Sequence, residues 1–480
     1  MKKRRGESVA EIIIIGAGLT GLSAAYHLEK QGFFDYSIVE QETKAGGLLR
    51  SVEENGFTFD YTGHLIHINN PYFREFLEDV TNLANFNLIT RNAAIFSHNV
   101  LTDYPFQINL HGLPTEVAVE CIEGYVQRAQ HIKHPKNFYQ WVLKHFGTGF
   151  GKHFFFQFNG KLLSYDLTKV HADQLGRFFP STDLRLIIKG TLEKNPPAGI
   201  GYNSSFYYPK QGGIEFLIQQ LKKQVTKILN IEHRVCAIDT INKIVSYTNG
   251  RTETYKTIIS TMPLSELLPL IKTSSKTVLH NASQKLVCNT VININLGFSV
   301  DNIGNYHWLY FPERHIPFYR MGFWHNLNPT SAPAGKTAVY GEVSYNPKKT
   351  SLSQAKDITA NTIKHMLNYL KLEPHHVIAK KILTIKHAYV IYDAWRQKNL
   401  PILLTTLKEL SIHSTGRYGG WKYSGMQEAV LDGKDAAQSS LITLKKPQAT
   451  IIPAQRASYH TQTLKRRKRH HGSHQTILQK

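Results

Sequence analysis

The sequence predicts an α/β protein, α+β overall, that opens with a strand–turn–helix–strand unit. Three observations predict this unit. A β-branched run at Glu11–Ile15 is followed at once by the glycine-spaced turn Gly16-Ala-Gly18-Leu-Thr-Gly21. Apolar residues then recur at helical spacing from Leu22 to Leu28. A second short strand, Tyr36–Val39, ends at Glu40, so the order of elements is that of a βαβ unit.

The rest of the chain carries further helix and strand patterns in sequence. Helices are predicted over Pro71–Thr90, Glu116–Lys133, Phe138–Phe146, from Gly213 through Lys222, and over Leu352–Leu370. Strands are predicted near Val235, over Lys256–Ser260, and within Val287–Val343, where they are expected to form a mixed sheet. The last ordered segment is predicted over Gly416–Ala437. We find no internal repeats.

Length and composition are those of a soluble, multi-domain globular protein. The chain has 480 residues, of which 41% are hydrophobic, which exceeds the size of a single domain of roughly 150 residues. No apolar run approaches the roughly 20 residues that cross a bilayer. The basic start, Met1–Arg5, is followed by Glu7 and Glu11 instead of an apolar signal segment. We therefore expect a cytoplasmic protein.

The three cysteines and the charge distribution narrow the classes of function. Cys121, Cys236 and Cys288 are scattered, which predicts no disulfide framework and no metal site. The net charge is +22, but nine Lys or Arg residues and no acidic residue fall within 445–480. We therefore expect residues 445–480 to be a basic disordered tail and expect no specific nucleic-acid binding. Weak contact of this tail with an anionic membrane surface, and hence a peripheral location, stays open.

The glycine motif and Glu40 together predict a Rossmann-like dinucleotide site. Gly16 permits the tight turn, Gly18 lets the backbone approach a pyrophosphate, and Gly21 lets the helix lie close to the strand. Glu40 follows at about the spacing of a carboxylate that accepts hydrogen bonds from an adenosine ribose. NAD and FAD both use such a unit, so this segment alone leaves the choice between them open.

Two further segments resemble one family of flavoproteins and favour FAD. Gly46-Gly47-Leu48-Leu49-Arg50 resembles the second glycine pair of the amine oxidase and UDP-galactopyranose mutase superfamily. Gly416–Ala429 is similar to the C-terminal flavin segment of that family, and the resemblance covers about residues 8–440. It implies FAD as the cofactor and the following residues as its contacts: Gly16, Gly18, Gly21, Glu40, Gly46, Gly47, Leu48, Val235, Gly416, Arg417 and Met426.

The resemblance also implies a substrate site beside the flavin. Tyr61–Asn70, with His64 and His67, resembles the mutase segment whose histidines lie beside the isoalloxazine. The remaining substrate-site residues that the resemblance implies are Arg177, Arg320, Tyr345 and Tyr423, with Arg417 as a third phosphate-binding arginine. Arginine suits this role because its planar fork makes paired hydrogen bonds to phosphate oxygens.

Two positions depart from the mutase pattern. Leu163 stands where the mutases have a stacking tryptophan, and Gly425 stands where they have an aspartate. The segments Tyr104–Gln107 and Phe178–Pro180 are more like those of amine oxidase or protoporphyrinogen oxidase types. The sequence therefore favours an FAD-dependent oxidoreductase that transfers hydride from an organic substrate to flavin N5. The alternative is a mutase-like flavoenzyme that isomerises a UDP-sugar with no net redox change, and a non-catalytic FAD-binding scaffold is the third.

These inferences predict a discontinuous FAD-binding domain with a substrate region inserted in it. The FAD-binding domain is predicted to comprise residues 8–70, 201–265 and 380–440. Residues 71–200 and 266–379 are predicted to form the helical and mixed-sheet substrate region. The expected partner is a small-molecule substrate, with a nucleoside diphosphate sugar as one candidate.

Overall fold

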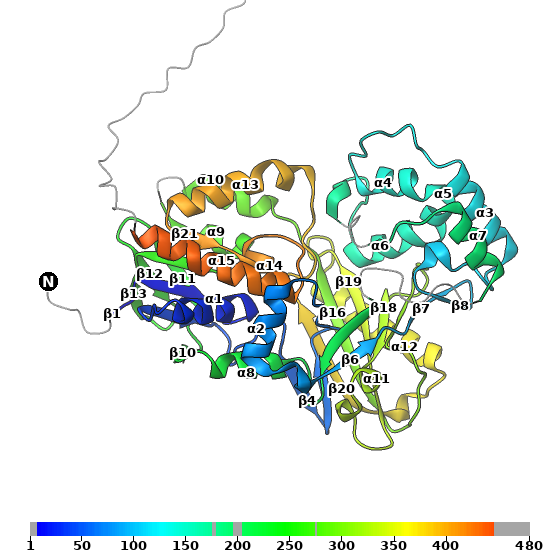
Figure 1. The fold of residues 1–480 in the computed structure, drawn as a ribbon, viewed down its shortest axis with the longest axis horizontal. Coiled ribbons are helices and arrows are strands. Elements are labelled where there is room, and N and C mark those ends of the chain that lie inside the picture. Colours follow the sequence, from blue (N-terminus) through cyan, green and yellow to red (C-terminus); the bar gives the residue numbers. More distant parts are fainter. Residues whose placement is uncertain (1–6, 175–178, 195–203, 274–275, 446–480) are drawn as a thin grey trace, which may run out of the picture. The chain divides into compact units, whose positions relative to one another are not determined.

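The structure, a computed structural model, describes residues 7–174, 179–194, 204–273 and 276–445. The chain divides into two units, Met1–Leu444 and Lys445–Lys480, and the architecture that follows is that of the first (Figure 1). Arg177 and the predicted basic tail after Lys445 lie outside the described residues.

The predicted N-terminal βαβ unit is part of a five-stranded sheet in which all neighbouring strands are parallel. Its strand order is β10 (Leu229–Asn230), β3 (Tyr36–Val39), β2 (Ile12–Ile15), β14 (Thr257–Ser260) and β21 (Ile412–Ser414). All four residues of β2 are buried, because both faces of a parallel sheet are covered. Helix α1 (Leu19–Lys30) connects β2 to β3, which confirms the βαβ unit.

A second five-stranded sheet flanks the first. Its order is β1 (Glu7–Val9), β13 (Thr252–Thr254), β12 (Ile244–Tyr247), β11 (Val235–Asp239) and β15 (Ile271–Lys272). The helices of this part of the chain are α9 (Leu264–Leu270), α10 (Lys276–Lys285), α13 (Ala394–Glu409), α14 (Gly416–Gly419) and α15 (Met426–Lys445). Side chains of α9, α13 and the two sheets share one apolar cluster, so the sheets are joined by a common core.

A seven-stranded mixed sheet forms the other large layer and confirms the mixed sheet predicted within Val287–Val343. Its order is β20 (Val377–Ile385), β16 (Thr290–Phe298), β19 (Thr337–Tyr345), β18 (Arg320–Phe323), β17 (Trp308–Tyr310), β7 (Ala93–Ser97) and β8 (Val100–Asp103). Only the β17–β7 pair in this sheet is parallel. Helix α12 (Leu352–Leu370) has the predicted bounds and begins at a capping box formed by Ser351 and Gln354.

A helical region rich in aromatic residues follows β8. It contains α3 (Thr115–Val126), α4 (Phe138–His145), α5 (Gly147–Phe150), a π-helical turn (Gly151–Phe155), α6 (Phe156–Leu163) and α7 (Leu184–Leu192). Phenylalanines from α4, α5, α6 and the π-helical turn pack into one core with Ile95 of β7 and Tyr319 before β18. This core fixes the helical region against the edge of the seven-stranded sheet.

Two predicted helices are longer in the sequence pattern than in the structure. Helix α2 covers only Pro71–Thr81, because Asn82 adopts a left-handed backbone (φ 63°) that stops the helix. Phe86–Thr90, predicted as helix, is strand β6, paired with β9 (Ser205–Pro209). Helix α3 ends at Val126 instead of Lys133. At Phe86–Thr90, pairing with β9 overrides a helical apolar pattern.

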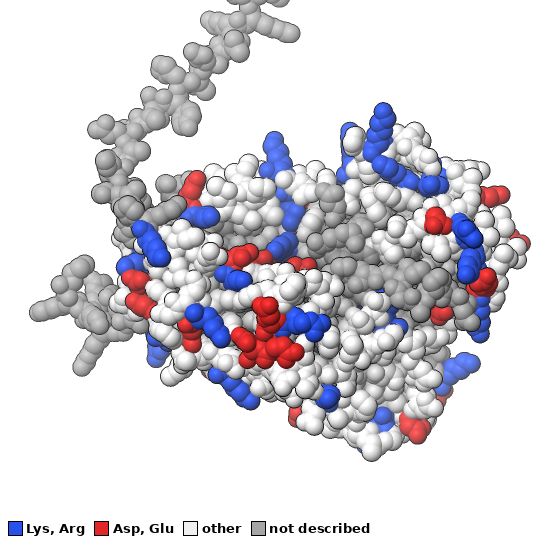
Figure 2. Space-filling view, in the orientation of Figure 1, with Lys and Arg blue, Asp and Glu red and all other residues white. Residues whose placement is uncertain are grey.

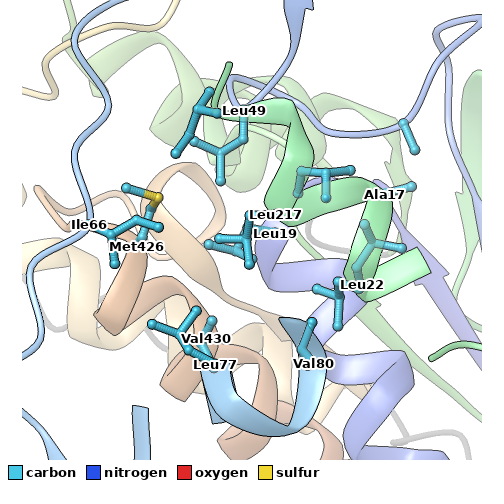
Figure 3. Close-up of a cluster of buried hydrophobic side chains, with 14 of the residues drawn as sticks. Ala17, Leu19, Leu22, Leu49, Ile66, Leu77, Val80, Leu217, Met426 and Val430 are labelled. Carbon is cyan, nitrogen blue, oxygen red and sulfur yellow. The ribbon is translucent and has the colours of Figure 1, made fainter. Parts of the chain in front are cut away.

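The apolar core around α1 joins segments that are far apart in the sequence. Figure 3 shows Leu19 and Leu22 of α1 beside Leu77 and Val80 of α2, Leu217 of α8 (Glu215–Lys223), and Met426 and Val430 of α15. This packing holds the N-terminal ends of α1 and α15 near the short hairpin of β4 (Ser51–Glu54) and β5 (Phe57–Asp60). The elements that carry the glycine motifs are thereby held together.

The surface charge and the helices of the described residues indicate what kinds of partner surface the protein could meet. None of the described helices is long and apolar enough to pass through a membrane. On the face drawn in Figure 2, lysine and arginine side chains are scattered among acidic ones. That face therefore presents mixed charge.

Candidate active site

A cavity of about 930 Å³ opens at the carboxyl ends of β2 and β3, where α1 begins. This edge of a parallel sheet is where open α/β folds bind ligands. The structure brings most of the predicted cofactor residues to this one cavity. They are Gly16, Gly18, Glu40, Gly46, Gly47, Leu48, Val235, Gly416, Arg417 and Met426.

Gly18 and Gly47 face each other across a narrow gap at the cavity wall. A Cβ atom on Gly47 would lie 3.4 Å from Cα of Gly18, and the backbones of Gly18 and Gly46 form a parallel β-bridge. Gly21 serves another purpose, because a Cβ atom there would lie 1.9 Å from the carbonyl oxygen of Gly16. The first pair lets two stretches of backbone meet at the cavity wall, and Gly21 permits the close approach of α1 to β2.

The N-terminal end of α1 and the carboxylate of Glu40 fit the two ends of an adenosine diphosphate group. Gly18 caps α1 without a side-chain hydrogen bond, and Gly18, Leu19 and Thr20 line the cavity. The positive end of the helix is thus presented to a ligand anion. Glu40 lies at the end of β3, where its carboxylate accepts hydrogen bonds from the backbone N–H groups of Ala17 (2.9 Å) and Glu42 (3.0 Å). These residues therefore fit the adenosine diphosphate half of FAD.

His64 and two arginines gather at the far end of the cavity. Burial, together with the positive charges of Arg417 and Arg320, lowers the pKa of His64 to about 3. His64 is therefore neutral at physiological pH. Its side chain lies near the hydroxyl of Thr62, with Nδ1 at 3.3 Å from Oγ1. The positive charge at this end of the cavity therefore comes from the two arginines, and His64 adds no third cationic group.

The two arginines are held in different ways. Arg320 donates two hydrogen bonds to Glu342, from Nε (3.0 Å) and from Nη2 (2.6 Å). Arg417 donates to the backbone carbonyls of Ser424 (2.7 Å) and Ala388 (3.0 Å) instead. Arg417 thus keeps its full positive charge, while that of Arg320 is partly balanced by Glu342.

Aromatic rings complete this end of the cavity. The rings of Tyr389 and Tyr423 are stacked, with centroids 5.7 Å apart, and the guanidinium of Arg417 lies 4.6 Å from the Tyr423 ring centre. A smaller cavity of about 190 Å³ shares Trp308, Tyr310, Tyr319, Arg320, Tyr389 and Tyr423 with the large one. It extends toward the helical region, where it is lined by Phe154, Phe158, Asn159 and Phe179.

Several buried polar atoms of the residues at these walls have no hydrogen-bond partner among the described residues. They include Oδ1 of Asn159 in the smaller cavity and Oγ of Ser424 in the larger one. Buried polar groups are nearly always hydrogen-bonded in folded proteins. Both atoms are therefore available to a polar ligand that spans the two cavities.

Of the predicted substrate residues that the structure describes, Tyr345 is not brought to the cavities. Tyr345 ends β19 and packs in the apolar cluster with Met366 of α12. Side chains alternate along a strand, so Tyr345 and Glu342, three residues apart, lie on opposite faces of β19. Arg177 lies outside the described residues. Leu163, at the position of the missing tryptophan, is fully buried in the helical core.

Sequence motifs missed several residues that line both cavities, namely Trp308, Tyr310, Tyr319 and Tyr389. They lie in or beside strands β17 and β18 and just after β20, with no glycine or charge pattern near them. Their one signal is the density of aromatic residues in Tyr306–Phe323. That signal does not separate a cavity wall from an ordinary core.

Comparisons with known proteins show which family the chain resembles. The sequence profile of a family described as flavin-containing amine oxidoreductase matches residues 19–439. A segment of 53 residues is 45% identical to the mitochondrial protoporphyrinogen oxidase of Nicotiana tabacum, and covers 11% of this chain and 10% of that protein. A segment of 62 residues is 37% identical to a 4,4'-diapophytoene desaturase of Staphylococcus aureus (strain bovine RF122 / ET3-1), and covers 13% of this chain and 12% of that protein. The matches thus span about a tenth of the length of these curated relatives.

Solved structures are similar over nearly the whole chain. Reduced UDP-galactopyranose mutase is similar with a TM-score of 0.84 and 27% identity, over 91% of this chain and 96% of that chain. A putative protoporphyrinogen oxidase from Exiguobacterium sp. 255-15 is similar with a TM-score of 0.68 and 15% identity, over 93% and 100%. Putrescine oxidase bound to putrescine follows with 0.62 and 13%, over 91% and 100%. The last two likenesses show the fold alone.

Proposed function

Because the chain belongs to the flavin-containing amine oxidoreductase family, we propose that it is an FAD-dependent enzyme that isomerises a nucleoside diphosphate sugar without net redox change. FAD is its cofactor, as the glycine motifs predict. We therefore place the mutase-like reaction ahead of hydride transfer, although the sequence alone favours hydride transfer. The 27% identity to UDP-galactopyranose mutase over 91% of the chain supports this order.

The proposal rests on the positive charge at the end of the cavity that His64, Arg320 and Arg417 line, which we call the reactive end. Arg417 is held by neutral carbonyl groups and Arg320 also lines the cavity. His64, whose pKa both guanidinium charges lower, is neutral. A cationic amine would be repelled from such a site, whereas a diphosphate would be attracted. The site therefore suits an anionic substrate, and the two guanidinium groups suit adjacent phosphates.

The side chains of the two cavities have separate roles in this proposal. Arg417 and Arg320 bind the diphosphate, and the hydroxyls of Tyr389 and Tyr423 donate hydrogen bonds to its oxygens. The nucleoside lies in the smaller cavity against the rings of Phe154, Phe158 and Phe179, which supply aromatic surface although Leu163 does not. The bound flavin supplies the electron pair that lets the sugar ring open and close again.

A second candidate is hydride transfer from an organic substrate that bears carboxylate groups. The departures at Leu163 and Gly425 favour it, because both lie in segments where the mutases hold their substrate. So does the 45% identity of one segment to a protoporphyrinogen oxidase. The cationic end of the cavity would bind carboxylates by the same hydrogen bonds.

The test is sugar conversion by purified, FAD-loaded protein under anaerobic conditions, with and without dithionite. We expect UDP-galactose to be converted to its ring-contracted isomer only when the flavin is reduced, with no net reoxidation. Arg417→Lys should lower conversion strongly, while Tyr345→Phe, which changes a side chain outside both cavities, should not. A flavin spectrum without sugar conversion or UDP binding would reject the mutase proposal in favour of an oxidisable substrate. If neither a UDP-sugar nor an oxidisable substrate is converted, the remaining candidate is a non-catalytic FAD-binding scaffold.

A further inference from the structure

Three side chains form a connected row of sulfur, imidazole and carboxylate, of which only Glu266 lines the large cavity. Sγ of Cys288 lies 3.3 Å from Nδ1 of His387, and Nε2 of His387 lies 2.8 Å from Oε1 of Glu266. Cys288 lies just before β16, His387 just after β20, and Glu266 in α9. An isolated antiparallel β-bridge between Cys288 and Val390 holds the segment before β16 beside the segment after β20.

The hydrogen-bond directions in this row favour a charged imidazole. The carboxylate of Glu266 only accepts, so Nε2 of His387 donates to it. Although burial opposes the charge, the hydrogen bonds to Cys288 and Glu266 raise the pKa of His387 to about 9. The hydrogen bond from His387 in turn lowers the pKa of Glu266. At neutral pH Nδ1 therefore carries a proton that it donates toward the sulfur.

The surrounding charges do not cancel this arrangement. Lys386 and Arg234 both act on Glu266 and keep it ionised. The hydroxyl of Tyr418, from α14, faces Cys288 as an uncharged group, since burial raises its pKa. The rings of Tyr418 and Trp421 lie 6.4 and 6.2 Å from the ring of His387. The imidazole of His387 is thus positioned by these two aromatic rings as well as by its hydrogen bonds.

The row is also open to reagents. Cys288 is partly exposed, and the side chains of His387 and Glu266 are 21% and 44% exposed. A nucleophile, a base and a group that orients the base, in hydrogen-bonding reach of one another, form the general arrangement that activates a thiol. No catalytic or cofactor role assigned above uses Cys288.

We propose that Cys288, His387 and Glu266 form a thiol modification site at which peroxides oxidise Cys288 to a sulfenic acid. The thiolate sulfur attacks one peroxide oxygen, and the O–O bond breaks. The leaving hydroxide takes the proton from Nδ1 of His387 and departs as water, leaving a neutral imidazole. Sulfur is oxidised by two electrons and the peroxide is reduced by two.

The two other cysteines of the chain are internal controls. Cys121 is buried, and burial raises the pKa of its thiol to about 12, so it should stay unreactive in the folded protein. Cys236 is exposed on β11, and its thiol donates only to the carbonyl of Ser246 (3.3 Å). If exposure alone set the rate of modification, Cys236 would react first.

The experiment measures modification of each cysteine by peptide mass spectrometry in the full-length, FAD-loaded protein. Iodoacetamide is used from pH 5.5 to 8.5, and hydrogen peroxide with a dimedone trap at pH 6.5. We expect Cys288 to be alkylated at least about tenfold faster than Cys236 at pH 6, and to be the main trapped sulfenic acid. An ordinary thiol slows about tenfold per pH unit below its pKa of about 8.5. The rate at Cys288 should fall much less.

Two variants test the role of the imidazole. His387→Gln should bring the rate at Cys288 at pH 6 down to that of Cys236 or below, and Cys288→Ser should abolish the trapped product. Flavin content and melting temperature report whether each variant is folded. If His387→Gln does not fold, the wild-type pH profile alone decides. Slower reaction of Cys288 than of Cys236 across the pH range, or a rate unchanged by His387→Gln, would overturn the proposal.

Discussion

Arg320 and Glu342 are directly opposite each other on strands β18 and β19 and are joined by two hydrogen bonds, of 3.0 and 2.6 Å. Glu342 is fully buried, whereas the side chain of Arg320 is 19% exposed and lines both cavities. The carboxylate thus fixes the direction of the guanidinium and balances part of its charge. Strand pairing therefore sets how strongly this end of the site attracts an anion.

Glu342→Gln should raise the affinity for UDP while lowering stability. The glutamine keeps the shape and can hold Arg320 by its carbonyl oxygen, but the positive charge is no longer balanced. We expect UDP to bind about tenfold more tightly by calorimetry. Loss of the partner charge should lower the free energy of unfolding by about 3 kcal/mol. Unchanged or weaker UDP binding by a folded variant would show that Arg320 does not contact the phosphates.

Gly18→Ala should separate cofactor binding from folding. Its backbone (φ −77°, ψ −176°) suits alanine, and the new Cβ atom would lie 3.8 Å from its nearest neighbour, an ordinary contact. The methyl group would stand on the cavity wall at the N-terminal end of α1, where the pyrophosphate is expected. We predict a folded protein by circular dichroism that has lost most of its flavin absorbance. Gly21→Ala, in contrast, should fail to fold, because its Cβ atom would clash with the carbonyl of Gly16.

Glu40→Ala should weaken FAD retention, because the carboxylate at the end of β3 is the predicted acceptor for the adenosine ribose. Flavin content after purification, and the dissociation constant of added FAD, give the measurement. Loss of one charged hydrogen-bonding partner should weaken binding by about tenfold or more. Glu53→Gln on β4 is the matched control, since Glu53 is exposed and outside the cavity. Equal flavin occupancy in the two variants would contradict the ribose role.

His27 should make stability fall as the pH drops below 6.5. Nδ1 of His27 lies 2.6 Å from the carbonyl of Ser23, and Nε2 lies 2.5 Å from the hydroxyl of Tyr72. Burial lowers its pKa to about 4. The unfolded chain binds a proton near pH 6.5 that the native state does not, so this contribution is present above 6.5 and is lost as the pH falls toward 4.

Urea unfolding of FAD-loaded protein at pH 7 and pH 5 measures this effect. The wild type should lose about 2 kcal/mol through His27 over this range, at about 1.4 kcal/mol per pH unit below 6.5. His27→Gln should be less stable at pH 7 but should show a shallower fall. His375→Gln, at an exposed position, should behave as the wild type. Identical slopes for all three proteins would mean that His27 is protonated in the native state.

The sequence by itself determined the cofactor end of the site. Gly16–Gly21, Glu40 and Gly46–Gly47 are each required by backbone geometry at a single turn or strand end, and such local requirements are visible along the chain. The helix over Leu352–Leu370 was predicted for the same reason, since its apolar spacing and capping residues are local. The resemblance at Gly416–Arg417 predicted a second segment of the same cavity wall.

At the end of the cavity near Arg320, the resemblance supplied the arginines, but tertiary structure decided the aromatic walls. Tyr389, just after β20, is far in sequence from Tyr319 and Arg320 at the start of β18, and only the arrangement of strands in the seven-stranded sheet brings them together. The same arrangement turned Tyr345 away from the cavity and paired Arg320 with Glu342, because side chains alternate along a strand. Pairing of Phe86–Thr90 with β9 likewise replaced a predicted helix by a strand. These outcomes depend on which strands pair with each other. The alternation of apolar and polar residues along one strand does not specify which other strand it will pair with.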